Sequence, residues 1–206
     1  MINYNTTTGL DVQKKDVKFL DACIHEDVSL TGAKYGVGAN GSKFIEIEFS
    51  KNGQTLTHTE YEPTRFADED DASLQSKADS QVKRLMQILL VFYKREMLGY
   101  NATSFEDFAR WIVSMLSAVS KDDKVRIKAV YNAKGYTGLP RYFKFTFIES
   151  MNVSKNDSMI KELGIDTFER PKQAEADKEV QSNSAEQTFI QSTTANTATT
   201  GSDLPF

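Results

Sequence analysis

The sequence has very little cysteine and histidine. Cys23 is the only cysteine among 206 residues, so an intramolecular disulfide and a cysteine-based metal site are both excluded. The two histidines, His25 and His58, are scattered along the chain and do not form a metal-ligand motif. We therefore expect a protein without a metal or another cofactor.

Long hydrophobic segments are also missing. The longest apolar run is interrupted by Gln87 and is far too short to span a bilayer. The first fifteen residues contain no apolar segment of the signal-peptide type. These absences predict a cytoplasmic protein with no membrane partner.

Motifs for enzymatic chemistry are absent as well. Gly36, Gly38 and Gly41 match G-x-G-x-x-G, and residues 36–43 approach a phosphate-binding loop. However, residues 44–49 read as a strand, whereas both motifs require a helix at that point. With no catalytic triad in a suitable context either, we expect a protein that is not an enzyme.

Charge is distributed unevenly along the chain. The net charge is −4, which argues against a protein that is basic throughout. Residues 121–149 nevertheless contain seven cations and three acids, a local charge of +4, whereas residues 60–71 contain six acids and only Arg65. Local charge matters more than the total for a nucleic-acid groove, so the basic stretch is the candidate binding region.

The basic stretch, residues 124–149, predicts a β-hairpin around a loop at residues 132–140. One face of its strands is apolar and carries Val125, Ile127, Ala129, Phe143, Phe145 and Phe147. The opposite face carries cations and a tyrosine, namely Lys124, Arg126, Lys128, Tyr142 and Lys144. Cations hold phosphates and aromatic rings stack on bases, so this face suits single-stranded nucleic acid. The alternative interpretation is an ordinary solvated sheet face.

The remaining elements precede this hairpin. A first strand is predicted within residues 17–30, with a kink near Glu26 and Asp27, and a glycine-rich loop at residues 32–43 follows it. A second hairpin, 44–49 with 54–61, turns at Asn52 and Gly53. Periodic apolar residues then predict one helix that begins after the acids at 68–71 and ends at Leu98, and another that begins at Ser104. A short helix is also predicted within residues 152–168.

The order of these elements is three strands, two helices and two strands. It is typical of an OB-fold, a five-stranded Greek-key barrel that binds oligonucleotides on strands 2 and 3 and on loops 1–2 and 4–5. We therefore predict a mainly β, OB-fold-like single-stranded DNA-binding domain at residues 15–170, with a two-helix insertion at about 72–119 between strands 3 and 4. A different α+β arrangement is the alternative, because the insertion is longer than a single helix. Loops 1–2 and 4–5 would be residues 32–43 and 132–140.

Both ends of the chain differ from this domain in composition. Residues 1–14 are polar, and we expect a flexible N-terminus. Residues 171–206 are rich in Gln, Ala, Ser, Thr, Asn and Glu and contain few apolar side chains. Such a segment cannot bury a core, so we expect a disordered C-terminal tail.

The tail closes on Asp203, Leu204, Pro205 and Phe206. An OB-like domain followed by a polar linker and this tetrapeptide resembles the single-stranded DNA-binding proteins of bacteria and bacteriophages. The resemblance implies that the tip docks proteins of DNA replication, repair and recombination. The tip has one acid where several are usual in that family. The small, tail-bearing chain with its helical insertion resembles a bacteriophage version, which would act in the host cytoplasm.

These observations predict a non-enzymatic protein that coats and protects single-stranded DNA and recruits partners through its tip. The predicted DNA contacts are Lys34, Tyr35, Lys43, Arg126, Lys128, Lys134, Tyr136, Arg141, Tyr142 and Lys144. The predicted partner contacts are Asp203, Leu204, Pro205 and Phe206. A homo-oligomer is compatible with the sequence. The alternative function is a protein-interaction adaptor or recombination accessory factor without strong DNA binding.

The tail generates a prediction of its own. Residues 172–206 have two cations and five acids, so the tail competes weakly with DNA for a basic face. Deleting residues 203–206 should leave DNA affinity unchanged or slightly raised, and it should abolish pull-down of a replication or repair protein. Loss of DNA binding, or retention of every partner, would contradict the resemblance.

Overall fold

We describe a computed structural model of the chain, which places residues 18–171. The predicted flexible N-terminus at 1–14 and the predicted docking tip at 203–206 lie outside these described residues, as does the tail after residue 171. The described residues fall within the predicted domain, residues 15–170, except for Pro171.

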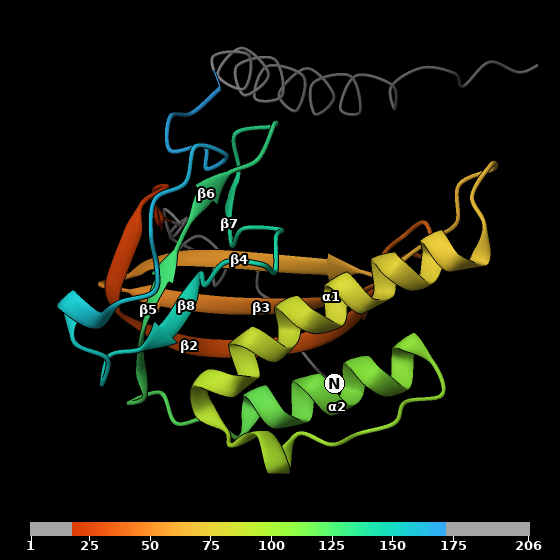
Figure 1. Cartoon of the computed structure of the whole chain (residues 1–206), viewed down its shortest axis with the longest axis horizontal. Helices are drawn as coiled ribbons and strands as arrows, with labels where there is room; N and C mark the ends of the chain where they lie inside the picture. The colour runs from red at the N-terminus through yellow and green to blue at the C-terminus, as the bar shows by residue number, and fades with distance from the viewer. Residues whose placement is uncertain (1–17, 172–206) are drawn as a thin grey trace, which may run out of the picture.

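The main sheet has six strands in the order β1-β4-β3-β2-β5-β8 (Figure 1). They are β1 (Lys18–Phe19), β2 (Ile24–Val37), β3 (Lys43–Lys51), β4 (Gln54–Tyr61), β5 (Lys124–Lys128) and β8 (Ile148–Ser150). Strands β2, β3 and β4 follow one another, and β5 returns after a long connection to pair with β2, which is the order of a Greek key. A separate ladder pairs β6 (Val130–Tyr131) with β7 (Thr137–Gly138), and β7 lies beside β4.

The prediction of a mainly β domain with two inserted helices is confirmed, but its closure into a barrel is not. Strands β1 and β8 form the two edges of an open sheet. Within residues 18–171 no ladder of hydrogen bonds joins β4 to β7 or to β8. The β6–β7 ladder therefore stands against β4 as a separate wall.

The hairpin of β3 and β4 forms where the sequence predicts it. Asn52 and Gly53 both have positive φ, 50° and 76°, as a two-residue hairpin turn requires. The antiparallel register runs without a shift from the Lys51–Gln54 pair to the Phe44–Tyr61 pair. This register decides which side chains of β4 face the candidate site.

Strand β2 is longer than predicted. It continues through Gly32 to Val37, so the connection to β3 is only residues 38–42, not 32–43. The ring of Phe44 covers Gly36, so a side chain at this position would require that ring to move. The predicted kink near Asp27 is confirmed by its φ of 56° and by the register shift between His25 and Val28.

Two helices follow β4. Helix α1 (Asp71–Phe92) begins at the predicted acidic cap, where the Asp70 side chain accepts the N–H of Ser73 at 2.8 Å. It ends six residues before Leu98, and a 3-10 turn, η2 (Arg95–Met97), follows it. At this end the Tyr93 hydroxyl donates to the Met115 carbonyl of the second helix at 2.8 Å.

Helix α2 (Phe105–Ser117) begins as predicted, with the Ser104 hydroxyl accepting the N–H of Asp107 at 3.1 Å. No helix among the described residues is long and apolar enough to cross a membrane.

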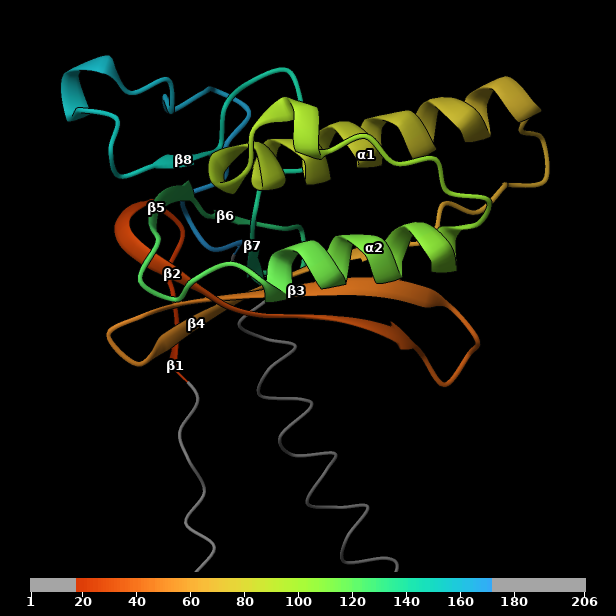
Figure 2. The same ribbon diagram turned by 90° about the horizontal axis from the view of Figure 1, so that it is seen from below.

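Both helices lie on one side of the β2–β3–β4 sheet (Figure 2). The core fills the space between the sheet and the helices. Strand β3 points Ile45, Ile47 and Phe49 into it, and α2 contributes Ile112 and Leu116. The opposite face of β3 and β4 is free of helices. This arrangement leaves one face of the sheet for a site.

The predicted hairpin at 124–149 forms only in part. Strand β5 pairs with a three-residue β8, and residues 139–147 between β7 and β8 are not a strand. Phe147 is buried but Phe145 is half-exposed, so the prediction that these phenylalanines share a core face is wrong. Residues 152–168 form a loop over the sheet with one 3-10 turn, η3 (Lys155–Asp157), in place of the predicted helix. Alternation wrongly predicted a strand at residues 143–147, because this segment makes tertiary contacts that the local sequence does not show.

Candidate nucleic-acid interface

A groove of about 460 Å³ runs between β4 and the β6–β7 hairpin. Thr57, Thr59 and Tyr61 line it from β4, and Tyr136 and Arg141 line it from the opposite wall. It lies where the barrel would close. The groove is therefore a direct consequence of the open sheet.

The wall on β4 follows from strand alternation. Leu56, His58 and Glu60 are buried, so the odd-numbered residues of β4 face away from the core. The N–H and C=O groups of these odd-numbered residues point away from β3, toward the outer edge of β4. The hydrogen bond from Leu20 N–H to the Thr55 carbonyl lies on this edge. The groove thus exposes both threonine hydroxyls and edge backbone groups.

The floor continues across the sheet through cross-strand neighbours. Tyr61 pairs with Phe44, their rings 5.8 Å apart, and the next row joins Thr59, Glu46 and Lys34. These rows combine aromatic rings with polar side chains on the helix-free face. The surface next to the groove can therefore take up flat aromatic groups.

The hairpin wall presents an exposed tyrosine on a fixed turn. The Asn132 side-chain oxygen accepts the N–H groups of Lys134 and Tyr136, at 2.9 and 3.0 Å. Gly135 completes the turn with a φ of 73°, a conformation that glycine adopts without strain. The Tyr136 side chain keeps 51% of its surface exposed. A ring held in this way can stack on a base with little loss of conformational freedom.

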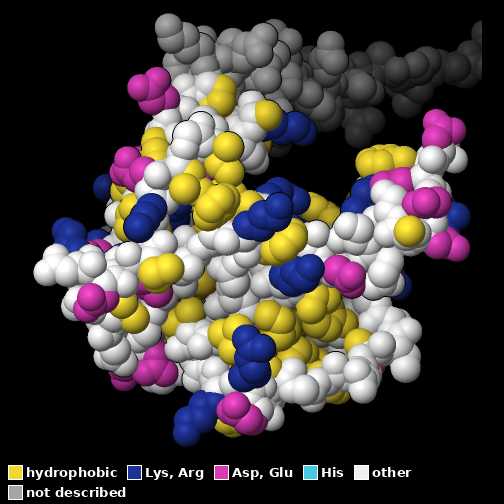
Figure 3. Space-filling view, in the orientation of Figure 1, with side chains coloured by type: hydrophobic (Ala, Val, Ile, Leu, Met, Phe, Trp, Pro, Cys, Tyr) yellow, Lys and Arg dark blue, Asp and Glu magenta, His cyan; other side chains and the backbone are white. Residues whose placement is uncertain are grey.

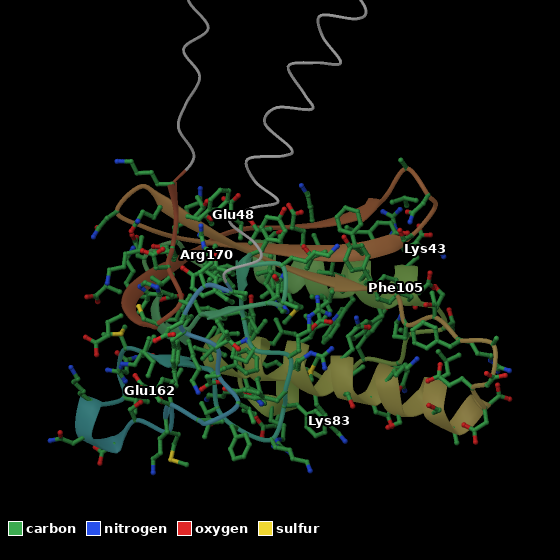
Figure 4. All side chains as sticks on the ribbon, turned by 90° about the horizontal axis from the view of Figure 1, so that it is seen from above. Lys43, Glu48, Lys83, Phe105, Glu162 and Arg170 are labelled. Carbon is green, nitrogen blue, oxygen red and sulfur yellow. The ribbon has the colours of Figure 1, made fainter. Side chains whose placement is uncertain are left out.

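A second tyrosine, Tyr131, lines the groove at the base of the hairpin. Its N–H donates to the Thr167 carbonyl at 2.8 Å, and the Arg170 guanidinium lies 5.2 Å from its ring centre. In Figure 4, Arg170 and Lys43 lie well apart along the sheet, and Lys83 lies on the helix side. Arg170 therefore adds a cation beside Tyr131, far from Lys43 along the sheet.

Five of the predicted DNA contacts lie on or near this surface. Tyr136 and Arg141 line the groove, and Lys134 is in the same hairpin turn. Lys34 and Lys43 lie on β2 and β3, but each has an acidic partner. Lys34 contacts Glu46 at 2.6 Å, which raises the pKa of the lysine, and Lys43 is 3.8 Å from Glu62. Neither Lys134 nor Arg141 on the hairpin side has an acidic partner within residues 18–171.

Arg126 and Lys128 were predicted to lie on an exposed face, and that placement is wrong. Both side chains are buried, Lys128 completely. Arg126 forms ion pairs with Glu26 and Glu149, and Lys128 pairs with Asp166 at 2.7 Å. Strand alternation put them on the correct face of β5, but the loop at 152–168 covers that face.

Two predicted tyrosine contacts also lie elsewhere. Tyr35 pairs with Ile45 on the helix side of β2, with the Arg110 guanidinium 5.3 Å from its ring. Tyr142 is half-buried, and its hydroxyl donates to Asp166 at 2.9 Å. Lys144 is exposed between β7 and β8, outside the groove. In Figure 3, Lys and Arg side chains lie among hydrophobic ones across the middle of the face that carries the helices.

Sequence reasoning missed Tyr61, Tyr131 and Arg170. Tyr61 could have been found, because it ends the alternating series Thr55, Thr57, Thr59 on the polar face of the predicted hairpin. Tyr131 could not, because alternation continued from Val125 and Ile127 puts it on the apolar face. That alternation does not extend to Tyr131, since β5 and β6 are separate strands in separate ladders.

A buried polar network holds β4 in place behind the groove. Both carboxylate oxygens of Glu60 accept from the Arg84 guanidinium of α1, at 2.7 and 2.9 Å, and His58 and Gln81 also contact this carboxylate. Arg84 donates in addition to the carbonyl of Arg141 at 3.1 Å. One carboxylate therefore connects β4, α1 and the far wall of the groove.

Burial on its own raises the pKa of Glu60, but the hydrogen bonds from Arg84 and His58 outweigh it and hold that pKa well below its usual range. The carboxylate is thus charged in the folded protein over the whole physiological range.

The described residues offer no alternative site for metal chemistry. Between residues 18 and 171, no three His, Cys, Asp or Glu side chains gather in a way that could hold a metal ion. Comparison with known proteins adds no assignment, because no protein-family model and no curated protein matches the chain.

The Glu60 network leads to a prediction about pH. A carboxylate whose pKa is lowered by folding stabilises the protein above its unfolded pKa, near 4.5, and loses that contribution as pH falls below it. Glu60→Gln should lower the free energy of unfolding at pH 7 by about 3–5 kcal/mol, because it leaves Arg84 without its countercharge. The difference from the parent protein should shrink on acidification below about pH 4.5. Urea unfolding at several pH values measures this, and a difference independent of pH would contradict it.

Proposed function

We propose that this protein binds single-stranded DNA in the groove between β4 and the β6–β7 hairpin. The observation that carries the proposal is the placement of Tyr61, Tyr131 and Tyr136 around one open groove with Arg141 on its wall. Aromatic rings stack on any base, and cations follow the phosphate backbone. The combination suits a strand whose bases are unpaired.

The distribution of charge gives the strand a preferred path. Glu48 lies on the open face of β3 beside the Lys34–Glu46 ion pair, so the centre of the sheet carries a net negative charge that disfavours phosphates. Lys134, Arg141 and Arg170 lie along the hairpin side. The phosphates would therefore follow the hairpin wall, and the bases would point toward Tyr61 and the floor.

The strand order supports the assignment of the domain as OB-like. The Greek-key order β5-β2-β3-β4, with the helices inserted before β5, is the topology on which OB-folds bind oligonucleotides. The groove lies on β4 and on the connection from β5 to β8, which correspond to strand 3 and loop 4–5. On this assignment the protein is a non-enzymatic component of DNA replication, repair or recombination. The phage-type origin and the recruitment of partners through the 203–206 tip belong to the same proposal.

A salt titration with fluorescent oligo-dT tests the proposal. Each phosphate contact on a single strand contributes about −0.7 to the slope of log K against log salt concentration, so three cations give a slope of roughly −2. Duplex DNA of the same sequence should bind more weakly at every salt concentration. Undetectable binding, or equal affinity for duplex and single strand, would favour the adaptor function.

The two exposed tyrosines of the groove, Tyr61 and Tyr136, generate a separate prediction. Tyr136→Ala or Tyr61→Ala should weaken oligo-dT binding by about 1–3 kcal/mol, or roughly 5- to 150-fold, because each removes a stacking ring. The slope with salt should not change, since no phosphate contact is lost. Tyr100→Ala is the matched control, since Tyr100 is an exposed tyrosine that stacks on Trp111 of helix α2. An equal loss in this control would contradict the assignment of the groove.

A further inference from the structure

A buried polar cluster lies beside the β6–β7 hairpin and has no role in the proposed DNA contacts. The Lys128 ammonium, with no exposed surface, donates to the Tyr142 hydroxyl at 2.8 Å, to Asp166 at 2.7 Å and to the Lys161 carbonyl. The Tyr142 hydroxyl donates in turn to the second oxygen of Asp166 at 2.9 Å. All three ammonium protons have acceptors, so the cluster is fully satisfied.

The carboxylate of Asp166 is held in a defined turn. One of its oxygens accepts the N–H of Leu163 at 2.9 Å, and its own N–H donates to the Leu163 carbonyl at the same distance. Burial, followed by the hydrogen bond to Asp166 and the charge of that carboxylate, raises the pKa of Tyr142, so its hydroxyl remains a donor. The Asp166 carboxylate is therefore the acceptor on which the cluster depends.

Asp166 is connected to both ends of the hairpin through residues adjacent in the chain. Thr167, the next residue, accepts the N–H of Tyr131 at 2.8 Å at the start of the hairpin. Tyr142, which bonds to the carboxylate, directly follows Arg141 at the end of the hairpin. Tyr131 and Arg141 both line the groove. One side chain is thus linked to both ends of this wall, and Arg84 holds the Arg141 end as well, through the Arg141 carbonyl.

We propose that Asp166 is a positioning residue, which sets the distance of the β6–β7 hairpin from β4 and so the shape of the groove. Lys128 supplies the countercharge that keeps the carboxylate buried, and Tyr142 couples it to the far end of the hairpin. The inference rests on the proposed function only in that the groove is where DNA binds.

The chain offers a matched control on the same strand. Arg126 is two residues from Lys128 on β5, is also buried, and pairs with Glu149 of β8. Glu149 also accepts the N–H of Met159, so this ion pair leads to the loop after β8 and not to the hairpin. Loss of the Asp166 carboxylate leaves Lys128 without its ion pair, whereas loss of the Glu149 carboxylate leaves Arg126 with Glu26 alone, at 3.2 Å.

The experiment compares Asp166→Asn with Glu149→Gln. Amide hydrogen exchange in the free protein reports local opening of the wall. In Asp166→Asn, the Tyr131 and Asn132 amides should exchange about tenfold faster relative to the core amide of Ile47, because the bonds that hold the hairpin are lost. In Glu149→Gln this ratio should stay at the parent value. Exchange that rises equally throughout the protein in Asp166→Asn would overturn the proposal.

Binding of oligo-dT provides the second readout, at a temperature where both variants are fully folded by circular dichroism. Asp166→Asn should weaken binding about tenfold with an unchanged salt slope, whereas Glu149→Gln should bind like the parent. A smaller salt slope would show that a phosphate contact was lost and would contradict a positioning role. If the parent itself fails to bind, the proposed function fails, and the exchange measurement still decides the role of Asp166.

Tyr142→Phe keeps the test decisive if Asp166→Asn does not fold. The substitution retains the ring and removes only the hydroxyl between Lys128 and Asp166. Faster exchange of the Tyr131 and Asn132 amides, with weaker oligo-dT binding, is the expected result. Exchange and affinity both equal to the parent would overturn the coupling of the two hairpin ends through Asp166.

Discussion

The burial of two cations on β5 is the constraint on which the rest of the structure depends. An unpaired buried charge costs several kcal/mol, so Arg126 and Lys128 each require a carboxylate in the interior. Those carboxylates, Glu149 and Asp166, come from residues after β7. The chain after β8 therefore has to fold back across the sheet, which buries β5 on both faces.

This cover divides the helix-free face of the sheet into two parts. Over β5 the face is closed by residues 152–168, whereas over β3 and β4 it is open. The groove begins at the end of the segment 152–168 that covers β5. Tyr131 connects the two, since its N–H bonds to the Thr167 carbonyl and its side chain lines the groove. On the other side, Glu60 and Arg84 fix β4 to helix α1. Because Arg84 also donates to the Arg141 carbonyl, the Glu60–Arg84 pair supports both walls of the groove, and the Lys128–Asp166 pair adds support on the hairpin side.

The sequence was informative where local signals determine structure. The turn at Asn52 and Gly53, the cap at Ser104 and the succession of β3, β4, α1 and α2 along the chain follow from short-range rules, and the structure confirms them. The wrong placements share a different cause. Alternation shows which face of a strand a side chain occupies, but it cannot show whether a distant segment covers that face. For Arg126 and Lys128, the covering segment lies beyond β8 and has no regular pattern of its own.

The same burial also changes what the charge of the chain means. The basic stretch at 121–149 appeared as a local charge of +4, but two of its seven cations are neutralised inside the protein. The cations left on the hairpin wall are too few for binding dominated by counterion release. A strand in this groove would gain much of its affinity from stacking on tyrosines, which salt does not screen. A chain with a net charge of −4 can therefore hold an anionic polymer, provided that the aromatic rings are rigidly placed and the acids of β3 keep phosphates away from the floor.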